Sequence, residues 1–140
     1  MMQGKITARE LTEAGVPVVY TDDMAFGHLW QMHKRKINIV LMGIDSIRKD
    51  GIVNKVGSYP IAVFAKENRI PVYFVGELMK IDRRKKIEIE ERNPEEIIKQ
   101  IELPKAKLEN PSFDSTPYKY IDKIICEKGI LTPRQLLKLF

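Results

Sequence analysis

The sequence predicts an α/β fold, namely a Rossmann-like open parallel sheet with helices on both faces. The main observation is two short apolar, largely β-branched or aromatic runs, Ile37 to Met42 and Pro71 to Val75, each followed directly by a glycine. Such continuous apolar runs are typical of strands buried on both faces of a parallel sheet. Helical patterns lie before and between these runs, so helices and strands alternate along the chain.

The segment before the first run predicts two helices and a strand. Residues Lys5 to Ala14 carry apolar side chains at helical spacing, and Gly15 is placed to end that helix. Pro17 to Tyr20 is predicted as a short buried strand. Asp22 to Lys34 is predicted as a second helix because its apolar residues recur at the helical period.

Between the two apolar runs, the sequence predicts a crossover helix. Ser58 can cap the helix and Pro60 is tolerated in its first turn. The apolar residues that follow supply a buried face; they are Ile61, Ala62, Phe64 and Ala65.

After the second apolar run, the sequence predicts a segment on the surface of the protein and further helices. A basic loop to Lys86 precedes an acidic segment in which Asn93 would cap, and Pro94 open, a short helix. Two more helices are predicted from their capping patterns, one from Thr116-Pro117 to Lys128, ended by Gly129, and one from Thr132-Pro133 to the last residue.

Length and composition predict one domain over residues 1–140, because 140 residues of which 44% are hydrophobic can bury one core. Without an apolar stretch of roughly 20 residues, we expect no membrane partner and a cytoplasmic location. The net charge of +5 and two basic clusters, His33 to Lys36 and Arg83 to Lys86, are attributed to a solvated surface rather than to a nucleic-acid partner.

The sequence gives no indication of a cofactor or metal. Neither a GxGxxG motif nor a P-loop is present, so we expect no NAD or ATP. His28 and His33 are five residues apart, which places them on different faces of a helix. Cys126 is the single cysteine, follows an isoleucine-rich stretch and is interpreted as a packing residue.

Two places carry candidate chemistry. Asp45 follows Gly43 beyond the first apolar run, where partial desolvation would raise its pKa and suit it to proton transfer, although turn aspartates are common. The segment from Asn54 to Ser58 leads into a helix N-terminus, which attracts anions. Lys55 adds a charge, and Gly57 lets the backbone approach a phosphate closely. The alternative is a purely structural role, in which Ser58 caps the helix, Lys55 is solvated and Gly57 forms a turn.

Together these residues resemble a known signature. Gly43-Ile44-Asp45 followed by residues 51–59, GIVNKVGSY, resembles the GAD and NGxxxNKxGTY motifs of methylthioribose-1-phosphate isomerases, ribose-1,5-bisphosphate isomerases and initiation factor 2B alpha, beta and delta subunits. Further landmarks of that superfamily lie along nearly the whole chain, namely ITARELTEAGVPVVYTDDMA, AKENRIPVYFV, IEERNPEEI, NPSFDSTP and IICEKGI.

The resemblance implies roles for individual residues. It makes Asp45 the residue that takes part in converting a 1-phosphorylated aldose to a ketose, and it places Asn54 and Lys55 at the substrate phosphate. From the loop itself we also expect Gly57 and the Ser58 hydroxyl to bind the phosphate. Ile44 departs from the signature, which has alanine there. The family's catalytic cysteine and upstream arginines precede the matched region, and Cys126 does not replace that cysteine.

The resemblance also implies that this is the carboxyl-terminal lobe of the superfamily, without the family's first, central strand. We therefore expect a homodimer or a partner that carries the missing amino-terminal lobe, and a phosphorylated sugar or nucleotide as ligand. Three functions remain open: half of a sugar-1-phosphate isomerase, a non-catalytic regulatory or assembly subunit like those of initiation factor 2B, and, with less support, an RNA-associated module.

Overall fold

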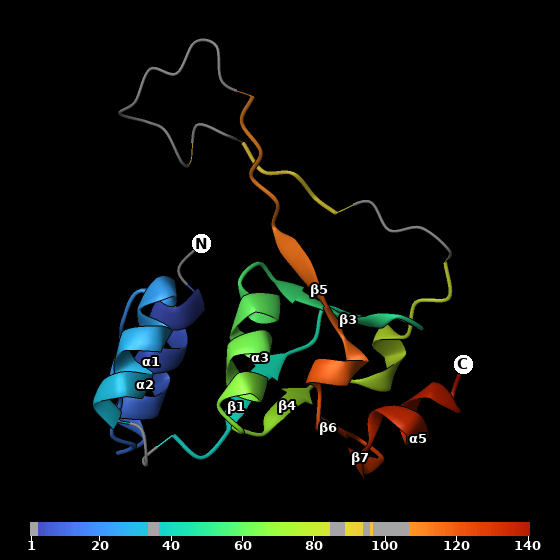
Figure 1. Cartoon of the computed structure of the whole chain (residues 1–140), viewed down its shortest axis with the longest axis horizontal. Coiled ribbons are helices and arrows are strands. Elements are labelled where there is room, and N and C mark those ends of the chain that lie inside the picture. Colours follow the sequence, from blue (N-terminus) through green and yellow to red (C-terminus); the bar gives the residue numbers. More distant parts are fainter. Residues whose placement is uncertain (1–2, 34–36, 85–88, 94–95, 97–106) are drawn as a thin grey trace. The chain divides into compact units, whose positions relative to one another are not determined.

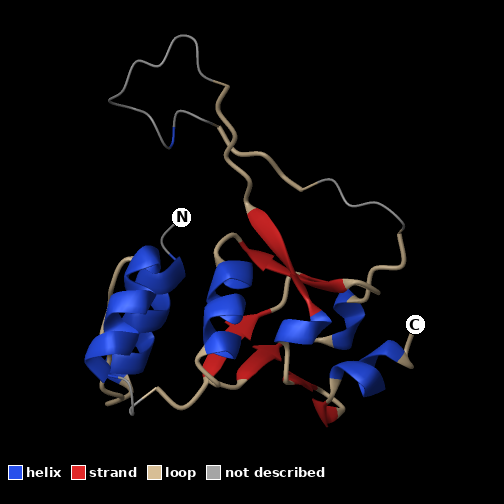
Figure 2. Ribbon diagram, in the orientation of Figure 1, coloured by secondary structure: helices blue, strands red, loops and turns tan. Residues whose placement is uncertain are grey.

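The computed structural model describes residues 3–33, 37–84, 89–93, 96 and 107–140 (Figures 1 and 2). The chain divides into two compact units, Met1–Lys34 and Arg35–Phe140. Each unit is described by itself below. The single domain over residues 1–140 stays a prediction.

The first unit is helical. Helix α1 spans Gln3–Glu13, and a short 3₁₀ turn, η1 (Asp23–Ala25), leads into α2 (Phe26–His33). Gly15 adopts a φ of 77°, the left-handed conformation that ends many helices, and its N–H bonds the carbonyl of Thr12. Both predicted helices are therefore confirmed.

The predicted strand at Pro17 to Tyr20 is wrong, because these residues form no regular structure. Val19 and Tyr20 are 75% and 60% exposed. A strand is stable only when a neighbouring strand satisfies its backbone groups, and none in the described residues pairs with this segment. The local apolar run was not sufficient by itself.

The second unit contains a four-stranded sheet in the order β1-β4-β6-β7. Its strands are β1 (Val40–Gly43), β4 (Val72–Val75), β6 (Lys123–Cys126) and β7 (Gly129–Leu131). The first three are mutually parallel, and β7 returns antiparallel to β6. This confirms the two predicted central strands, although β1 starts three residues later than expected. In the described residues, β1 lies at an edge of the sheet.

The two faces of this sheet differ in exposure. One face packs against α3 (Ser58–Glu67), which lies beside β1 and β4 in Figure 1 and buries Ala62 and Ala65. The side chains of that face at the centre of the sheet are fully buried; they are Val72, Phe74 and Ile124. The opposite face is partly open, since Leu41, Val75 and Ile130 are 58%, 41% and 62% exposed.

A second, antiparallel sheet has the order β2-β3-β5 and was not predicted. It comprises β2 (Ser46–Ile47), β3 (Gly51–Lys55) and β5 (Phe113–Pro117). One face is core, because Ile47, Ile52 and Thr116 are fully buried. Gly51 is required here, since a Cβ at that position would lie 2.4 Å from the carbonyl oxygen of Thr116.

The helix predicted from Thr116 to Lys128 is also wrong. Thr116 is the buried partner of Ile52 in the β3–β5 ladder, and a short 3₁₀ turn, η3 (Tyr118–Tyr120), then leads into β6. Gly129, with a φ of 96°, closes the turn between β6 and β7 rather than ending a helix. Tertiary pairing of β-branched residues therefore overrides the local Thr-Pro capping signal.

The last predicted helix is confirmed as α5 (Pro133–Leu137). The Thr132 side chain accepts the N–H of Gln135 and the Gln135 side chain accepts the N–H of Thr132, which forms a capping box. The helix that Asn93 and Pro94 were expected to start lies largely outside the described residues. No helix in the described part of the chain is long and apolar enough to span a bilayer.

These elements confirm the predicted fold class, an α/β fold with a parallel-stranded sheet flanked by helices. The parallel strands and α3 bring the end of β1 next to the second sheet, since the chain passes directly from β1 into β2 through Ile44 and Asp45. Asp45 is held there by its N–H, which donates to the carbonyl of Val53 at 2.9 Å. The fold thus places a sequence-predicted site residue at the junction of the two sheets.

Candidate functional site

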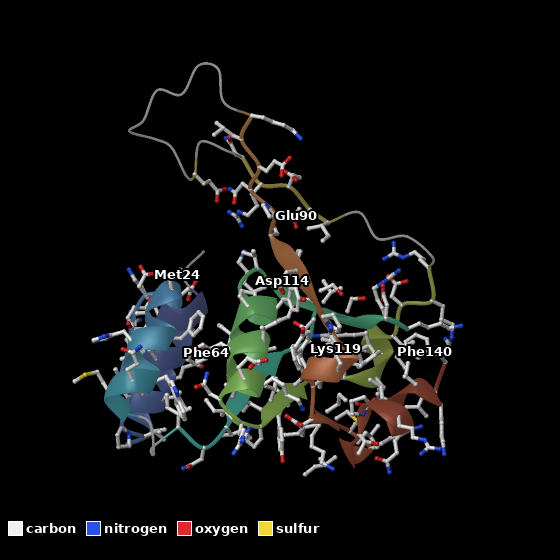
Figure 3. All side chains as sticks on the ribbon, viewed as in Figure 1. Met24, Phe64, Glu90, Asp114, Lys119 and Phe140 are labelled. Atoms are coloured by element: carbon white, nitrogen blue, oxygen red, sulfur yellow. The ribbon has the colours of Figure 1, made fainter. Side chains whose placement is uncertain are left out.

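A pocket of about 420 Å³ lies at this junction, on the face of the second sheet that is not core. Its walls are formed by the end of β1, by β2 and β3, by the start of β5 and by two segments that follow β4. The lining residues are Asp45, Ser46, Val53, Asp82, Arg84, Ile89, Glu90 and Phe113. Figure 3 labels Glu90, on the segment next to the start of β5.

Asp45 is the sequence-predicted catalytic residue that the structure places in this pocket. It lies beyond the carboxyl end of a parallel strand, the position where open α/β sheets bind ligands. Its carboxylate makes no hydrogen bond or ion pair within the described residues. The partial desolvation expected from sequence is not present in this chain, because Asp45 is exposed.

Lys55 and Asn54 are neighbours on β3 and therefore point to opposite faces of the sheet. Lys55 shares the face of Val53, a pocket residue. Its ammonium lies 5.9 Å from the ring centroid of Phe113, which also lines the pocket. Lys55 is thus at the edge of the pocket that contains Asp45, while Asn54 faces away from it.

Asn54 instead joins β3 to the start of α3. Its amide Nδ2 donates to the Ser58 hydroxyl at 2.9 Å, and that hydroxyl donates to the carbonyl of Lys55 at 2.7 Å. Ser58 is 5% exposed. The cap residue of α3 is Gly57, not Ser58, and Gly57 has a φ of 103° that favours glycine. The Ser58 hydroxyl therefore fastens the loop internally.

The helix N-terminus that was predicted to attract an anion already has one. The carboxylate of Asp114, on β5, accepts the N–H of Gly57 at 2.8 Å and that of Tyr59 at 3.1 Å. Figure 3 labels Asp114 close to the upper end of α3, where the helix begins. Burial raises the pKa of Asp114 above its ordinary value, against the effect of the two N–H donors.

On the opposite side of the pocket, Asp82 and Arg84 form a bidentate pair. The Arg84 guanidinium donates from Nε at 3.0 Å and from Nη2 at 2.8 Å, and its backbone N–H donates to the same carboxylate. These bonds lower the pKa of Asp82 to about 2 and raise that of Arg84. Arg48 is a second cation near Asp82, with Nη1 3.6 Å from Oδ2.

Lys80 contacts the backbone next to Asp45. Its ammonium donates to the carbonyl of Ile44, the residue just before Asp45. The Ile44 side chain is 3% exposed and packs over Gly76, where a Cβ would lie 2.8 Å from that of Ile44. Ile44 is not among the residues that line the pocket, so its larger side chain is accommodated in the core.

Sequence reasoning missed Asp82, Arg84, Lys80 and Asp114. A weak signal existed for the first two, because Asp-x-Arg after a strand allows a side chain to pair with the second following residue. Asp114 carried none, since its partner amides are more than fifty residues away. Within the described residues, no group of three or more His, Cys, Asp or Glu side chains is arranged to hold a metal ion.

Relatives of this chain include two kinds of sugar-phosphate isomerase. A ribose 1,5-bisphosphate isomerase from Thermococcus kodakarensis is 42% identical over 94% of this chain and 42% of its own length. A methylthioribose-1-phosphate isomerase from Acetivibrio thermocellus is 43% identical over 94% of this chain and 41% of its own length. The chain thus spans about two fifths of the length of these relatives.

Solved structures agree. The translation initiation factor eIF-2B subunit delta from A. fulgidus superposes with a TM-score of 0.80 at 33% identity, over 92% of this chain and 41% of that one. The 5-methylthioribose 1-phosphate isomerase from Pyrococcus horikoshii OT3 superposes with a TM-score of 0.81 at 34% identity, over 96% of this chain and 40% of that one. The model of the initiation factor 2 subunit family matches residues 1–133. The chain therefore belongs to the initiation factor 2 subunit family.

Proposed function

We propose that this chain is the carboxyl-terminal, phosphate-binding lobe of a sugar-1-phosphate isomerase. The observation that carries the proposal is the position of Asp45 in a pocket at the carboxyl end of β1, in a chain whose relatives include two isomerases of phosphorylated pentoses. The ligand would be ribose 1,5-bisphosphate or methylthioribose 1-phosphate, the compounds in the names of those relatives.

In this proposal Asp45 accepts the proton that leaves C2 of the sugar and returns it to C1, while the proton of the C2 hydroxyl passes to the ring oxygen that C1 releases. An aldose–ketose conversion needs a group that both accepts and donates a proton, and a carboxylate with no competing partner is suited to that exchange. The Lys80 ammonium, fixed on the Ile44 carbonyl, adds positive charge next to Asp45 and would favour a developing oxyanion there.

Lys55 is the proposed phosphate ligand. It lies on the pocket face of β3, at the edge formed by Phe113. Asn54, Gly57 and Ser58 would support this role indirectly, because their hydrogen bonds fix the turn from β3 into α3. Direct contacts of these three residues with a phosphate stay a prediction.

The rest of the active site would come from elsewhere. Asp45 is exposed, and proton transfer is more efficient in a site from which water is excluded. The edge of β1 and the partly open face with Leu41, Val75 and Ile130 offer places for a second copy or a partner that carries the amino-terminal lobe. Alone, the chain would bind ligand weakly and turn over nothing.

A second candidate is a regulatory or assembly subunit of the initiation factor 2B type. It is favoured by the superposition on the eIF-2B delta subunit. In that function the same pocket would sense a phosphorylated sugar or nucleotide, and the open sheet face would make the assembly contact. Asp45 would then have no proton to transfer.

Calorimetric titration separates the two candidates. The purified chain would be titrated with ribose 1,5-bisphosphate, methylthioribose 1-phosphate and AMP, alongside Lys55→Ala and the control Lys128→Ala, an exposed lysine in the β6–β7 turn. We expect a sugar phosphate to bind to the wild type and the control, and binding to be lost in Lys55→Ala. Binding of AMP but of neither sugar phosphate would favour the regulatory subunit over the isomerase, and absence of binding by every ligand would count against both.

A further inference from the structure

The Arg84 guanidinium has one edge occupied and one edge available. Its Nε and Nη2 donate to the Asp82 carboxylate, and within the described residues Nη1 donates to nothing. A guanidinium carries five N–H donors in a planar fork, so a bidentate pair on one side leaves a second donor edge. That fork matches the oxygens of a phosphate.

Arg84 is also held in place. Its side chain is 78% exposed, and an exposed arginine is normally mobile, but three of its nitrogens, including the backbone N–H, are bonded to one carboxylate. Asp82 is itself fixed, because its side chain is 12% exposed and its N–H donates to the Ile47 carbonyl. The Arg84 side chain therefore loses less rotamer entropy when it binds an anion than a free arginine would.

The strand order places Arg84 and Lys55 on opposite sides of the pocket. Residue 81 bridges to β2, β2 pairs with β3, and β3 carries Lys55. With neighbouring strands about 4.8 Å apart, the backbone next to Asp82 and that of β3 are separated by about 10 Å. Ser46, Val53 and Asp45 lie in the region between them.

We propose that Arg84 is a specificity-determining phosphate ligand: with Lys55 on one phosphate and Arg84 on the other, the pocket selects a sugar phosphorylated at both ends. Asp82 acts as the positioning residue that aims Arg84. The inference rests on the proposed function, because it uses the same pocket and ligand class. It adds a ligand for a second phosphate, whereas the proposed role of Lys55 requires only one phosphate.

The test compares ribose 1,5-bisphosphate with ribose 1-phosphate, which differ only in the terminal phosphate. Dissociation constants would be measured calorimetrically for the wild type, Arg84→Gln and Arg134→Gln. Arg134 is an exposed arginine of α5 outside the pocket and serves as the matched control. We expect Arg84→Gln to weaken binding of the bisphosphate about 10-fold, the value of one charge-assisted bond, and to change that of the monophosphate by about 2-fold or less. The control should change neither.

Two further measurements distinguish ligand contact from a structural role. Asp82→Asn should weaken only the bisphosphate, because it releases Arg84 without removing its charge. The Arg84 side-chain nitrogen signals should shift in ¹⁵N NMR when the bisphosphate is added but not with the monophosphate. Circular dichroism of each variant shows whether it folds, and Arg84→Lys, which keeps the charge, is the substitute if Arg84→Gln does not.

The outcomes separate this inference from the proposed function. If the wild type binds both sugars equally and Arg84→Gln behaves like the control, the assignment of Arg84 is overturned and the isomerase proposal stands. Equal weakening of both sugars by Arg84→Gln also overturns it, since Arg84 would then act on a shared group. If the wild type binds neither sugar, the proposed function fails and this inference fails with it.

Discussion

The carboxylate of Asp114 accepts the backbone N–H of Gly57 at 2.8 Å, across two segments more than fifty residues apart in sequence. This bond gives the N-terminus of α3 a carboxyl partner from within the chain. A phosphate would have to displace that carboxylate to reach the same amides. The structure therefore favours the pocket around Asp45, rather than the α3 N-terminus, as the place where an anionic ligand binds.

Removing the Asp114 carboxylate should destabilise the second unit. Asp114→Ala leaves the N–H groups of Gly57 and Tyr59 without their partner, and loss of a comparable cap costs about 1–2 kcal/mol. Urea unfolding monitored by circular dichroism measures this free energy. Glu67→Ala is the control, because Glu67 is an exposed carboxylate at the end of α3 that makes no hydrogen bond or ion pair within the described residues. Equal stability of Asp114→Ala and the wild type would show that the cap contributes nothing.

The same carboxylate should make stability depend on pH in a defined direction. Burial raises the pKa of Asp114 above 3.8, so just above that pH the folded chain keeps a proton that the unfolded chain has lost. The stability that Asp114 contributes is then complete below its unfolded pKa and falls as pH rises through the folded pKa. Asp114→Asn cannot titrate. The free energy of unfolding of the wild type minus that of Asp114→Asn should therefore decrease between pH 3 and neutrality; an increase would contradict the assignment.

Glu90 should oppose the binding of any anion in the pocket. It is one of three carboxylates in the lining, and of these Asp82 is compensated by Arg84 and Arg48. Glu90→Gln removes a like charge near the phosphates, which at a separation of several ångströms in water is worth about 1 kcal/mol or about 5-fold in affinity. We expect tighter binding of ribose 1,5-bisphosphate, with Glu67→Gln, an exposed residue at the end of α3, as the control. A weaker complex would mean that Glu90 accepts hydrogen bonds from the ligand.

The parallel strands and α3 could be predicted because their signals are local. The apolar runs that became β1 and β4 end at glycines, and α3 has both its cap region and its apolar face in one stretch of sequence. The errors share a different cause. Pro17 to Tyr20 has strand composition but no neighbouring strand, and Thr116 has a helix-start signal but is buried opposite Ile52. Long-range pairing decided both, and no local pattern encodes it.

The same difference between local and long-range signals applies to the candidate site. Asp45 and Lys55 could be named as candidates because one follows a strand and the other precedes a helix, which are positions that sequence reveals. The pocket itself could not be predicted, because its walls come from segments between residues 45 and 113 that meet only through the second sheet. That sheet was missed because β2 has only two residues and β3 resembles a loop in its glycine and asparagine content.

Asp45 should be essential for turnover but not for binding. Asp45→Asn keeps the size of the side chain and removes its ability to exchange a proton, so in a complex completed by the amino-terminal lobe we expect kcat to fall by about 100-fold or more. Binding of a phosphorylated sugar should remain, or become slightly tighter through the loss of a negative charge. Asp50→Asn, a nearby exposed aspartate, is the control. Unchanged turnover in Asp45→Asn would exclude its proposed role.

Gly76 and Ile44 should be energetically coupled. A Cβ at residue 76 would lie 2.8 Å from Cβ of Ile44, a distance that forces the backbone or the buried side chain to move, so Gly76→Ala should destabilise the fold by about 1–3 kcal/mol. Ile44→Ala, which restores the alanine of the family signature, should cost about 2–4 kcal/mol by itself because it opens a cavity.

Ile44→Ala removes Cγ1 and Cδ1, which would lie 3.3 and 3.4 Å from the added methyl group, but keeps the Cβ at 2.8 Å. Gly76→Ala should therefore cost less in the Ile44→Ala background than in the wild type, without becoming neutral. Gly43→Ala, at the matching end of β1, is the control, since its Cβ would meet Asn54 Oδ1 at an ordinary 3.5 Å. A double-mutant cycle from urea unfolding measures the coupling. Strictly additive free energies would mean that the Ile44 atoms beyond Cβ contribute no strain at residue 76.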